Sequence, residues 1–230
     1  MKTRRLAEVL KGILTHINNT RKSRGIFSAL VLVLKVIKDR LFFYRGAILF
    51  ARSLEDPLPD VQLDEGLTIR EITAEDLDFI ALTDELEAKF CQRSLESGAT
   101  GLAALKDNQL AAYIWFAPKV DLYLHQIYLP LAPGEVYSFN SVTLPAFRRQ
   151  GIQSTLYHWM FQLLCERGYK RVLTLVGLDN YPSLQMNSRL CRVIGHLMRI
   201  KFLRLVYFRY DPPIPGGASH TIKWLGIWTV

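Results

Sequence analysis

The stretch from Phe139 to Ser154, which reads FNSVTLPAFRRQGIQS, constrains the fold more than any other part of the chain. An apolar strand pattern over 136–144 stops at a proline, a basic turn follows, and an amphipathic helix begins after Gly151. The first amides of a helix lack intrahelical partners, and the helix dipole favours negative charge there. Gly151 lets a ligand approach the backbone closely, and the guanidinium groups of Arg148 and Arg149 suit phosphate. The pattern therefore predicts binding of a phosphate-bearing cofactor across the strand end.

On local chemistry alone, an ordinary strand-to-helix turn with two solvated arginines explains these residues equally well. A second segment, NYPSLQMNSRL over 180–190, adds to the pattern. Together the two segments resemble the acetyl-CoA-binding motifs of the GNAT superfamily of N-acetyltransferases. In that family a strand ending V-x-P is followed by Q/R-x-x-G-x-G/A and a helix, and later by N-x-x-S-x-x-x-(Y/N)-x-(K/R)-L. The resemblance covers residues 67–210.

The chain departs from the family pattern at three places. The strand end is one residue longer, Gln153 stands where the family has a small residue, and Cys191 with Arg192 replaces the usual G-F. The resemblance places a backbone amide around Ser141 to Thr143 at the thioester oxygen, and the pyrophosphate on the amides of residues 149–154. The residues that it implies for cofactor binding are Val142, Thr143, Leu144, Arg148, Arg149, Gln150, Gly151, Ile152, Gln153, Ser154, Asn180 and Ser183.

The resemblance also implies a reaction. An acetyl or other acyl group would pass from acetyl-CoA or another acyl-CoA to a primary amine by direct attack in a ternary complex. The acceptor would be an amino sugar, an amino acid or an envelope precursor, since the 135–151 stretch and the basic leader look like GNAT proteins that accompany bacterial polysaccharide export. One alternative is a CoA-binding or scaffold protein without catalysis. Another is a long-chain N-acyltransferase at the membrane surface.

Few residues stand out as catalytic groups. Attack requires a neutral amine, and Glu135, Tyr137 and Tyr128 are the candidate bases, because they lie near the acceptor side that the resemblance implies. Many relatives have a tyrosine where this chain has Asn187, which can hold a water molecule or the sulfur but cannot act as an acid. Cys191 has no histidine partner in sequence, which argues against a covalent thiol mechanism.

The net charge of +8 is unevenly distributed. Residues 1–55 hold 12 Lys and Arg against 3 acidic residues, a net charge of +9, whereas the remainder carries −1. Nucleic-acid binding by the whole protein is therefore not expected. We interpret residues 1–55 as a basic helical extension, helical throughout residues 1–53. Two roles remain open for it: a helical hairpin packed on the catalytic domain or a second subunit, and a segment lying on a membrane surface.

The cysteines, Cys91, Cys165 and Cys191, are odd in number and widely spaced, which favours a reducing compartment over a disulfide framework. We expect a cytoplasmic protein. The basic helical extension of residues 1–55 also allows peripheral attachment at the inner membrane face. No Cys and His residues have the spacing of metal ligands, so no metal is predicted.

The remaining patterns predict a linker over 56–66 and an acyl-CoA-binding catalytic domain over 67–230. Thr73 is a candidate N-cap with Asp76 three residues later, and Asp107-Asn108 is a candidate hairpin turn. The predicted order is β, α, β, β, β, α, β, α, β(β), an α/β fold with a mixed, mostly antiparallel sheet and helices on both faces. Strands are predicted over 67–72, 101–105, 109–116, 135–144 and 171–178, within 193–210, and as a last strand within 221–230. Helices are predicted over 74–90, over 152–168 and from 179. Residues 94–100 are predicted to form a loop, and residues 120–131 a strand or an irregular wall.

Overall fold

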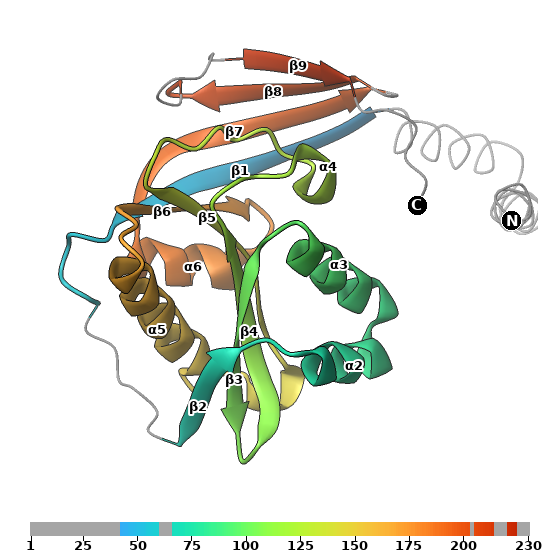
Figure 1. The fold of residues 1–230 in the computed structure, drawn as a ribbon. Helices are drawn as coiled ribbons and strands as arrows, with labels where there is room; N and C mark the ends of the chain where they lie inside the picture. Colours follow the sequence, from blue (N-terminus) through green and yellow to red (C-terminus); the bar gives the residue numbers. More distant parts are fainter. Residues whose placement is uncertain (1–41, 60–65, 203–204, 214–219, 225–230) are drawn as a thin grey trace, which may run out of the picture. The chain divides into compact units, whose positions relative to one another are not determined.

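The computed structural model describes residues 42–59, 66–202, 205–213 and 220–224 (Figure 1). The strands form one sheet in the order β2-β3-β4-β5-β6-β1-β7-β8-β9, in which β5 and β6 are parallel. The strands are β1 (Phe42–Ser53), β2 (Leu67–Glu71), β3 (Thr100–Lys106), β4 (Gln109–Ala117), β5 (Glu135–Thr143), β6 (Arg171–Gly177), β7 (Arg192–Phe202), β8 (Leu205–Asp211) and β9 (His220–Trp224). The helices are α2 (Ala74–Thr83), α3 (Glu85–Glu96), α4 (Leu122–His125), α5 (Ile152–Glu166) and α6 (Tyr181–Leu190), with a 3-10 turn at Pro145–Phe147.

The chain divides into two compact units. The larger comprises residues 45–198 and 208–221 and contains every site considered below. The described residues of the smaller unit, which spans 1–44, 199–207 and 222–230, are the ends of β1, β7, β8 and β9. The mixed sheet confirms the predicted α/β class, and the one or two strands predicted within 193–210 are two, β7 and β8.

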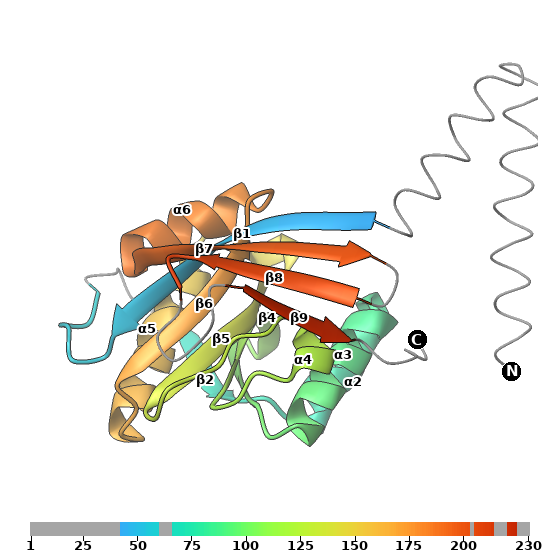
Figure 2. The same ribbon diagram turned by 90° about the horizontal axis from the view of Figure 1, so that it is seen from above.

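The prediction of helix throughout residues 1–53 is wrong for Phe42–Ser53, which form β1. β1 pairs antiparallel with β6, with Ala47 opposite Gly177 and Ser53 opposite Arg171, and lies between β6 and β7 (Figure 1). Figure 2 shows β1 and β7 side by side. Leu49, Phe50 and Ala51 are buried there. Burial on both faces of a central strand produces a continuous apolar run, which has no alternation to distinguish it from a buried helix. Residues 1–41 of the predicted extension lie outside the described residues.

The single helix predicted over 74–90 is in fact two helices, and the loop predicted over 94–100 begins later because α3 continues to Glu96. Asp84 has an extended backbone (φ −151°, ψ 98°), and its carboxylate accepts from the amides of Leu86 and Glu87 at 3.0 Å. A side chain that caps the next helix ends the previous one. The break turns α3 so that it packs against β3 and α4.

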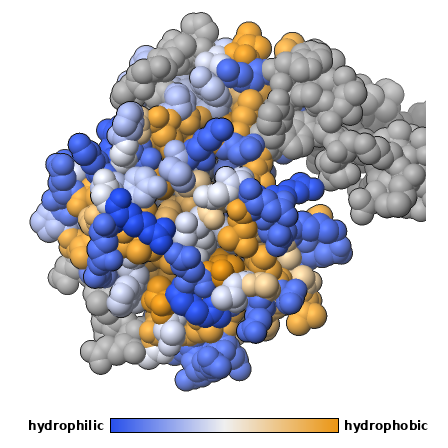
Figure 3. Space-filling model, in the orientation of Figure 1, coloured by the Kyte–Doolittle hydropathy of each residue, from blue (hydrophilic) through white to orange (hydrophobic). Residues whose placement is uncertain are grey.

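The core of the larger unit lies between the sheet and α5. Helix α5 packs on β3, β4 and β5, while α2 and α3 lie on the opposite face (Figure 1). Apolar residues from both layers are almost fully buried, which fixes the position of the α5 N-terminus against the end of β5. Hydrophobic and hydrophilic residues are interspersed on the face drawn in Figure 3, as is normal for a protein surface.

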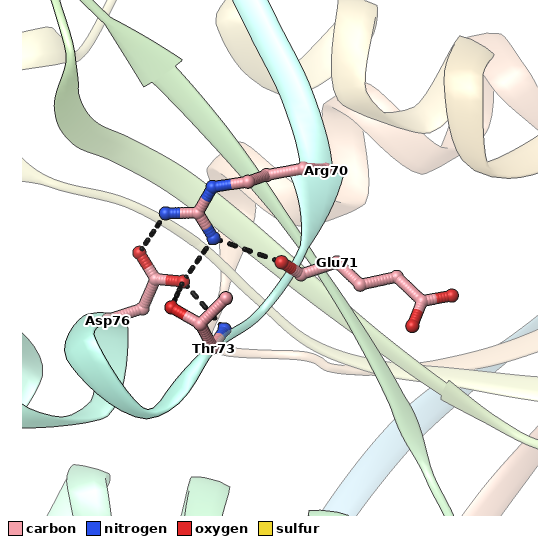
Figure 4. A network of polar contacts seen from close by, with 4 residues as sticks. All are labelled: Arg70, Glu71, Thr73 and Asp76. Atoms are coloured by element: carbon pink, nitrogen blue, oxygen red, sulfur yellow. Dashed lines mark hydrogen bonds and ion pairs between the residues drawn. The ribbon is translucent and has the colours of Figure 1, made fainter.

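The start of α2 is held by a polar network around Asp76 (Figure 4). Its buried carboxylate accepts from the Thr73 amide at 2.8 Å and from the Arg70 guanidinium at 2.6 and 3.0 Å. The network confirms Thr73 as the N-cap and Asp76 as the capping-box partner. Burial opposes ionisation, but the hydrogen bonds from Arg70 and Thr73 outweigh it and hold the pKa of Asp76 below its ordinary value.

Replacing Asp76 with asparagine is expected to lower the free energy of unfolding by about 1–2 kcal/mol at neutral pH, because a cap and a charge-assisted bond are lost. A carboxyl whose pKa is lower in the folded than in the unfolded state stabilises the protein at pH values above the unfolded-state pKa. This stability is lost as the pH falls through the folded-state pKa. Urea unfolding at several pH values should therefore show the difference between wild type and variant shrinking in acid. Asp78→Asn, on the exposed side of α2, is the control; equal stability of Asp76→Asn and wild type at neutral pH would contradict the assignment.

Candidate functional site

A cleft opens where β5 and β6 separate. The two parallel strands pair between Glu135–Ser138 and Arg171–Thr174, so among the described strands the rest of β5 has no partner on that side. A cavity of about 1060 Å³ occupies the space between the end of β5, the start of α5 and helix α6. It is lined by Arg52, Pro59, Ser141, Val142, Thr143, residues 147–154, Asn180, Pro182, Ser183, Gln185, Met186, Arg189 and Leu190. Most of the predicted cofactor-binding residues are thus brought together; Leu144 is not in this lining, and its amide donates to Ala111 O.

The turn between β5 and α5 presents free main-chain donors to the cleft. Gly151 is the N-cap of α5 with φ 76° and ψ −6°, and Arg149 also has a positive φ of 65°. Over the described part of the chain, the amides of residues 149–153 have no hydrogen-bond acceptor within the protein. The Ser154 amide, which was also predicted to bind the anion, donates instead to Gly151 O at 2.9 Å. Consecutive free amides at a helix N-terminus form a concave anion-binding site.

The side chains of the turn are partly engaged with the backbone. Arg148 Nε donates to Thr143 O at 3.1 Å, which ties the arginine to the end of β5. Gln153, in the place of the small residue of the motif, accepts from Thr143 Oγ1 at 2.8 Å, and its Nε2 is buried without a partner in the described structure. The larger side chain therefore folds back onto β5 and leaves an amide donor unused beside the cleft.

Helix α6 and β1 form the facing wall. The Asn180 side chain caps α6 by accepting from the Ser183 amide at 3.3 Å, and both residues line the cavity. Arg52 of β1 donates to Leu190 O at 2.9 Å, and its guanidinium carbon lies 5.0 Å from the centre of the Phe161 ring. Sequence reasoning missed Arg52 because it assigned residues 1–53 to a separate extension.

Buried polar groups gather under this wall, where the two strands part. The Tyr157 hydroxyl lies against the side chains of Ser141, Asn187 and Ser138, and burial raises the pKa of Tyr157 to about 12 despite these polar contacts. Asn187 Nδ2 donates to Ser183 O at 2.9 Å, whereas Asn187 Oδ1 and Ser138 Oγ are buried beside the Tyr157 hydroxyl. Tyr157 belongs to the apolar stripe of α5 in sequence, so only the position of the phenol in three dimensions indicates its polar role.

A bulge in β5 turns side chains to both sides of the sheet. Val142 pairs with Tyr113 and Phe139 pairs with Trp115, so β5 holds one residue more than β4 in this interval. The extra residue is at Asn140–Ser141, and Asn140 has a positive φ of 49°. Bulges of this kind re-aim side chains. Asn140 contacts α3 on one face, while Ser141 lines the cleft on the other.

The three predicted bases lie away from the cleft. Glu135 is buried at the start of β5, six residues before Ser141, which corresponds to roughly 20 Å of extended chain. It is paired with Arg171 and accepts from the Ala132 amide at 2.8 Å, an arrangement that favours a structural role. Tyr137 is buried beside Phe139, and burial raises the pKa of Tyr137. Tyr128 accepts a hydrogen bond at its main-chain oxygen from Tyr210.

Two further properties concern the described residues alone. In those ranges no group of three or more His, Cys, Asp and Glu side chains is arranged to bind a metal ion. In the same ranges no helix combines the length and apolarity needed to cross a bilayer.

Comparisons with known proteins bear on this geometry. The model of the Acetyltransferase (GNAT) family matches residues 67–190, more than half of the chain. None of the curated proteins matches. Two solved structures superpose with a TM-score of 0.53 over 75% of this chain: a conserved protein of unknown function from Staphylococcus epidermidis, at 13% identity over 67% of its length, and a Drosophila protein, at 16% over 58%.

A third structure is the tandem GNAT protein of the clavulanic acid biosynthesis pathway, with a TM-score of 0.52 and 16% identity. The match covers 80% of this chain and 71% of that protein. The chain therefore spans between 58 and 71% of the lengths of these three structures. At such identities the likeness concerns the fold.

Proposed function

The chain belongs to the GNAT family of acetyltransferases, which are acyl-CoA N-acyltransferases, and from this we propose that it transfers an acetyl or other acyl group from acyl-CoA to a primary amine. The observation that carries the proposal is the row of free amides at residues 149–153 at the edge of a cavity of about 1060 Å³. We propose an amino sugar, an amino acid or an envelope precursor as the acceptor.

The residues of the cleft fit a CoA ester. The amides of residues 149–153, with Arg148, Arg149 and Gln150 beside them, offer donors for the pyrophosphate. The unpaired side of β5 at Val142 and Thr143 is available to a pantetheine arm, which carries amides and can pair as an added strand. Asn180 and Ser183 face this strand across the cleft, where their polar groups can bind the same arm.

The reaction forms a carbon–nitrogen bond and breaks the carbon–sulfur bond of the thioester. The amine enters as an ammonium ion, loses one proton before attack and a second as the amide forms; one is released and the other ends on the CoA thiol. Negative charge develops at the carbonyl oxygen, and a main-chain amide near Ser141 to Thr143 would stabilise it. This part of β5 follows the bulge and borders the cleft.

We propose that Tyr157, Ser141 and Asn187 form the polar group that receives the leaving sulfur of CoA. The Tyr157 phenol is protonated at neutral pH, so its hydroxyl can donate a hydrogen bond that orients the Ser141 or Asn187 side chain. Cys191 is not proposed as a nucleophile. Burial, only partly opposed by Arg52, raises the pKa of Cys191 to about 11, which keeps it a thiol.

Tyr157→Phe is expected to lower kcat by about tenfold to a hundredfold, since the hydroxyl that orients Ser141 and Asn187 is lost. The affinity for CoA should change by less than about threefold, because the phenol lies below the cavity lining and not in it. The measurement is steady-state kinetics with calorimetric titration of CoA. Tyr169→Phe, outside the cleft, is the control; an unchanged kcat in Tyr157→Phe would contradict the assignment.

Calorimetry separates the main proposal from its alternatives. Acetyl-CoA and acyl-CoAs of rising chain length are titrated into the protein, and CoA release is then followed with a panel of primary amines. Binding of acetyl-CoA with turnover supports the proposal. Binding without turnover on any amine supports a CoA-binding scaffold, a preference for long chains supports a long-chain acyltransferase, and failure to bind any acyl-CoA rejects all three.

We also propose contact with a membrane surface or a second subunit through residues 1–41, supported by their basic, apolar composition. The odd number and wide spacing of the cysteines support a cytoplasmic location. Flotation with anionic liposomes should compare the full chain with a variant that begins at Phe42, since a longer deletion removes β1. Equal recovery of the two proteins would reject attachment at the inner membrane face.

A further inference from the structure

Glu87 of α3 holds a carboxylate on the opposite side of β5 from the cleft. Its Oε1 accepts from Asn140 Nδ2 at 2.6 Å and from the Tyr113 hydroxyl at 2.9 Å, and the Cys91 thiol lies 3.7 Å away. The two strong contacts come from adjacent strands, one of them from the bulge residue Asn140. The carboxylate is therefore positioned by the same distortion of β5 that turns Ser141 toward the cleft.

The charge of Glu87 has no cationic partner among the described residues. All three contacts are made by neutral groups to Oε1, and within the described ranges neither an ion pair nor a hydrogen bond engages Oε2. Burial raises the pKa of Cys91 to about 12, and the nearby charge of Glu87 is the second-largest cause of this shift. A half-buried carboxylate that lacks a cation is unfavourable in isolation, and a bound cation would offset that cost.

Aromatic rings stand beside this carboxylate. Phe90, one helical turn after Glu87, meets the rings of His125 and Phe139 edge-on at centroid distances of 6.2 and 6.1 Å. Phe139 and Tyr137 stack at 5.6 Å, and His125 lies 4.3 Å from Phe139. The group is reachable, because Glu87, Phe90, His125 and Asn140 are all only partly buried.

His125 adds a polar edge to the aromatic group. Burial lowers the pKa of His125 although its Nδ1 lies 3.0 Å from Asp121 O, so the ring is neutral at physiological pH and does not compete for the carboxylate. Its Nε2 is buried with no partner in the described part of the chain. The wall is thus apolar and aromatic with one carboxylate at its end, a combination that suits an ammonium group on an apolar stem.

We propose that Glu87 and the rings of Phe90, His125 and Phe139 bind the acceptor, and that the acceptor class is a primary ammonium ion carried on an alkyl or aryl-alkyl stem. The inference rests on the proposed acyltransferase function. Asn140 and Ser141 are consecutive residues that face opposite sides of β5, so an amine held at Glu87 lies across one strand from the cleft.

The test measures binding, so it does not depend on knowing the natural acceptor. The full chain, saturated with CoA, is titrated with 2-phenylethylamine hydrochloride and separately with 2-phenylethanol, which has the same stem without the charge. Wild type should bind the amine at least about tenfold more tightly than the alcohol, because a charge-assisted contact is gained. Glu87→Gln should lose most of this preference, whereas its amide oxygen can still accept from Asn140 and Tyr113.

Glu96→Gln is the matched control, because it removes the same charge from an exposed position on the same helix and should behave as wild type. Thermal unfolding of each variant verifies the fold. Equal affinity of wild type for amine and alcohol, or an undiminished preference in Glu87→Gln, overturns the inference. CoA affinity from the same samples distinguishes the two failures: intact CoA binding leaves the proposed function standing, and its absence in wild type rejects both.

Discussion

Replacing Gly151 with tryptophan is expected to weaken CoA binding by about a hundredfold or more while the fold is retained. A Cβ at this position meets no atom within 4 Å, so the indole extends into the cleft without displacing the core. There it covers the free amides of residues 149–153. Loss of two or more charge-assisted hydrogen bonds, each worth about 1.5–3 kcal/mol, gives the expected factor.

Two controls separate this blocking effect from backbone strain. Gly168, just after the other end of α5, has a φ of 78° and equally open surroundings, so Gly168→Trp carries the same strain without touching the cleft. Gly151→Ala introduces the left-handed strain, about 1–2 kcal/mol, without the bulk. Calorimetric titration of CoA and thermal unfolding should show the large affinity loss in Gly151→Trp alone. Wild-type affinity in that variant would remove the basis for the anion site.

Removal of β1 is expected to prevent folding. A chain that begins at Leu54 loses the strand between β6 and β7 together with the buried side chains of Leu49 and Phe50. Each large side chain lost from a core costs about 2–5 kcal/mol, and a domain of this kind has only about 5–15 kcal/mol in total. The deletion also leaves two unpaired strand edges, which favours aggregation.

The comparison is with a chain that begins at Phe42, which keeps β1 and should remain folded. Size-exclusion chromatography and thermal unfolding followed by circular dichroism report the difference. Phe50→Ala offers a graded version, with an expected loss of about 3–5 kcal/mol in the full-length protein. Cooperative unfolding of the chain that begins at Leu54, at the wild-type temperature, would show that β1 is dispensable.

The local parts of the fold could be predicted because neighbouring residues determine them. The Asp107-Asn108 turn has positive φ values of 51° and 63°, as a two-residue hairpin requires, and Asn180 caps α6 as its position before Pro182 indicates. The strand, turn and helix of residues 136–166 follow the same rule. In each case the signal lies within a few residues of the structure that it specifies.

The remaining features depend on contacts that are distant in sequence. Arg52 reaches the cleft only because β1 pairs with β6, and Glu87 meets Asn140 only across the sheet. The break at Asp84 was missed because apolar residues continue at helical spacing on both sides of it. Tyr157 is indistinguishable in sequence from its apolar neighbours on α5, since periodicity reports burial and not the polar group at the end of the side chain.

The position of β1 has a consequence for biosynthesis. This strand leaves the ribosome first among those of the sheet, yet its partner β6 follows roughly 120 residues later, an interval of about 6–24 s at ordinary elongation rates. Its other neighbour, β7, is translated later still. The nascent chain must therefore keep an apolar segment from premature association until both neighbours have emerged, and Arg52 takes its place in the wall of the cleft only at that late stage.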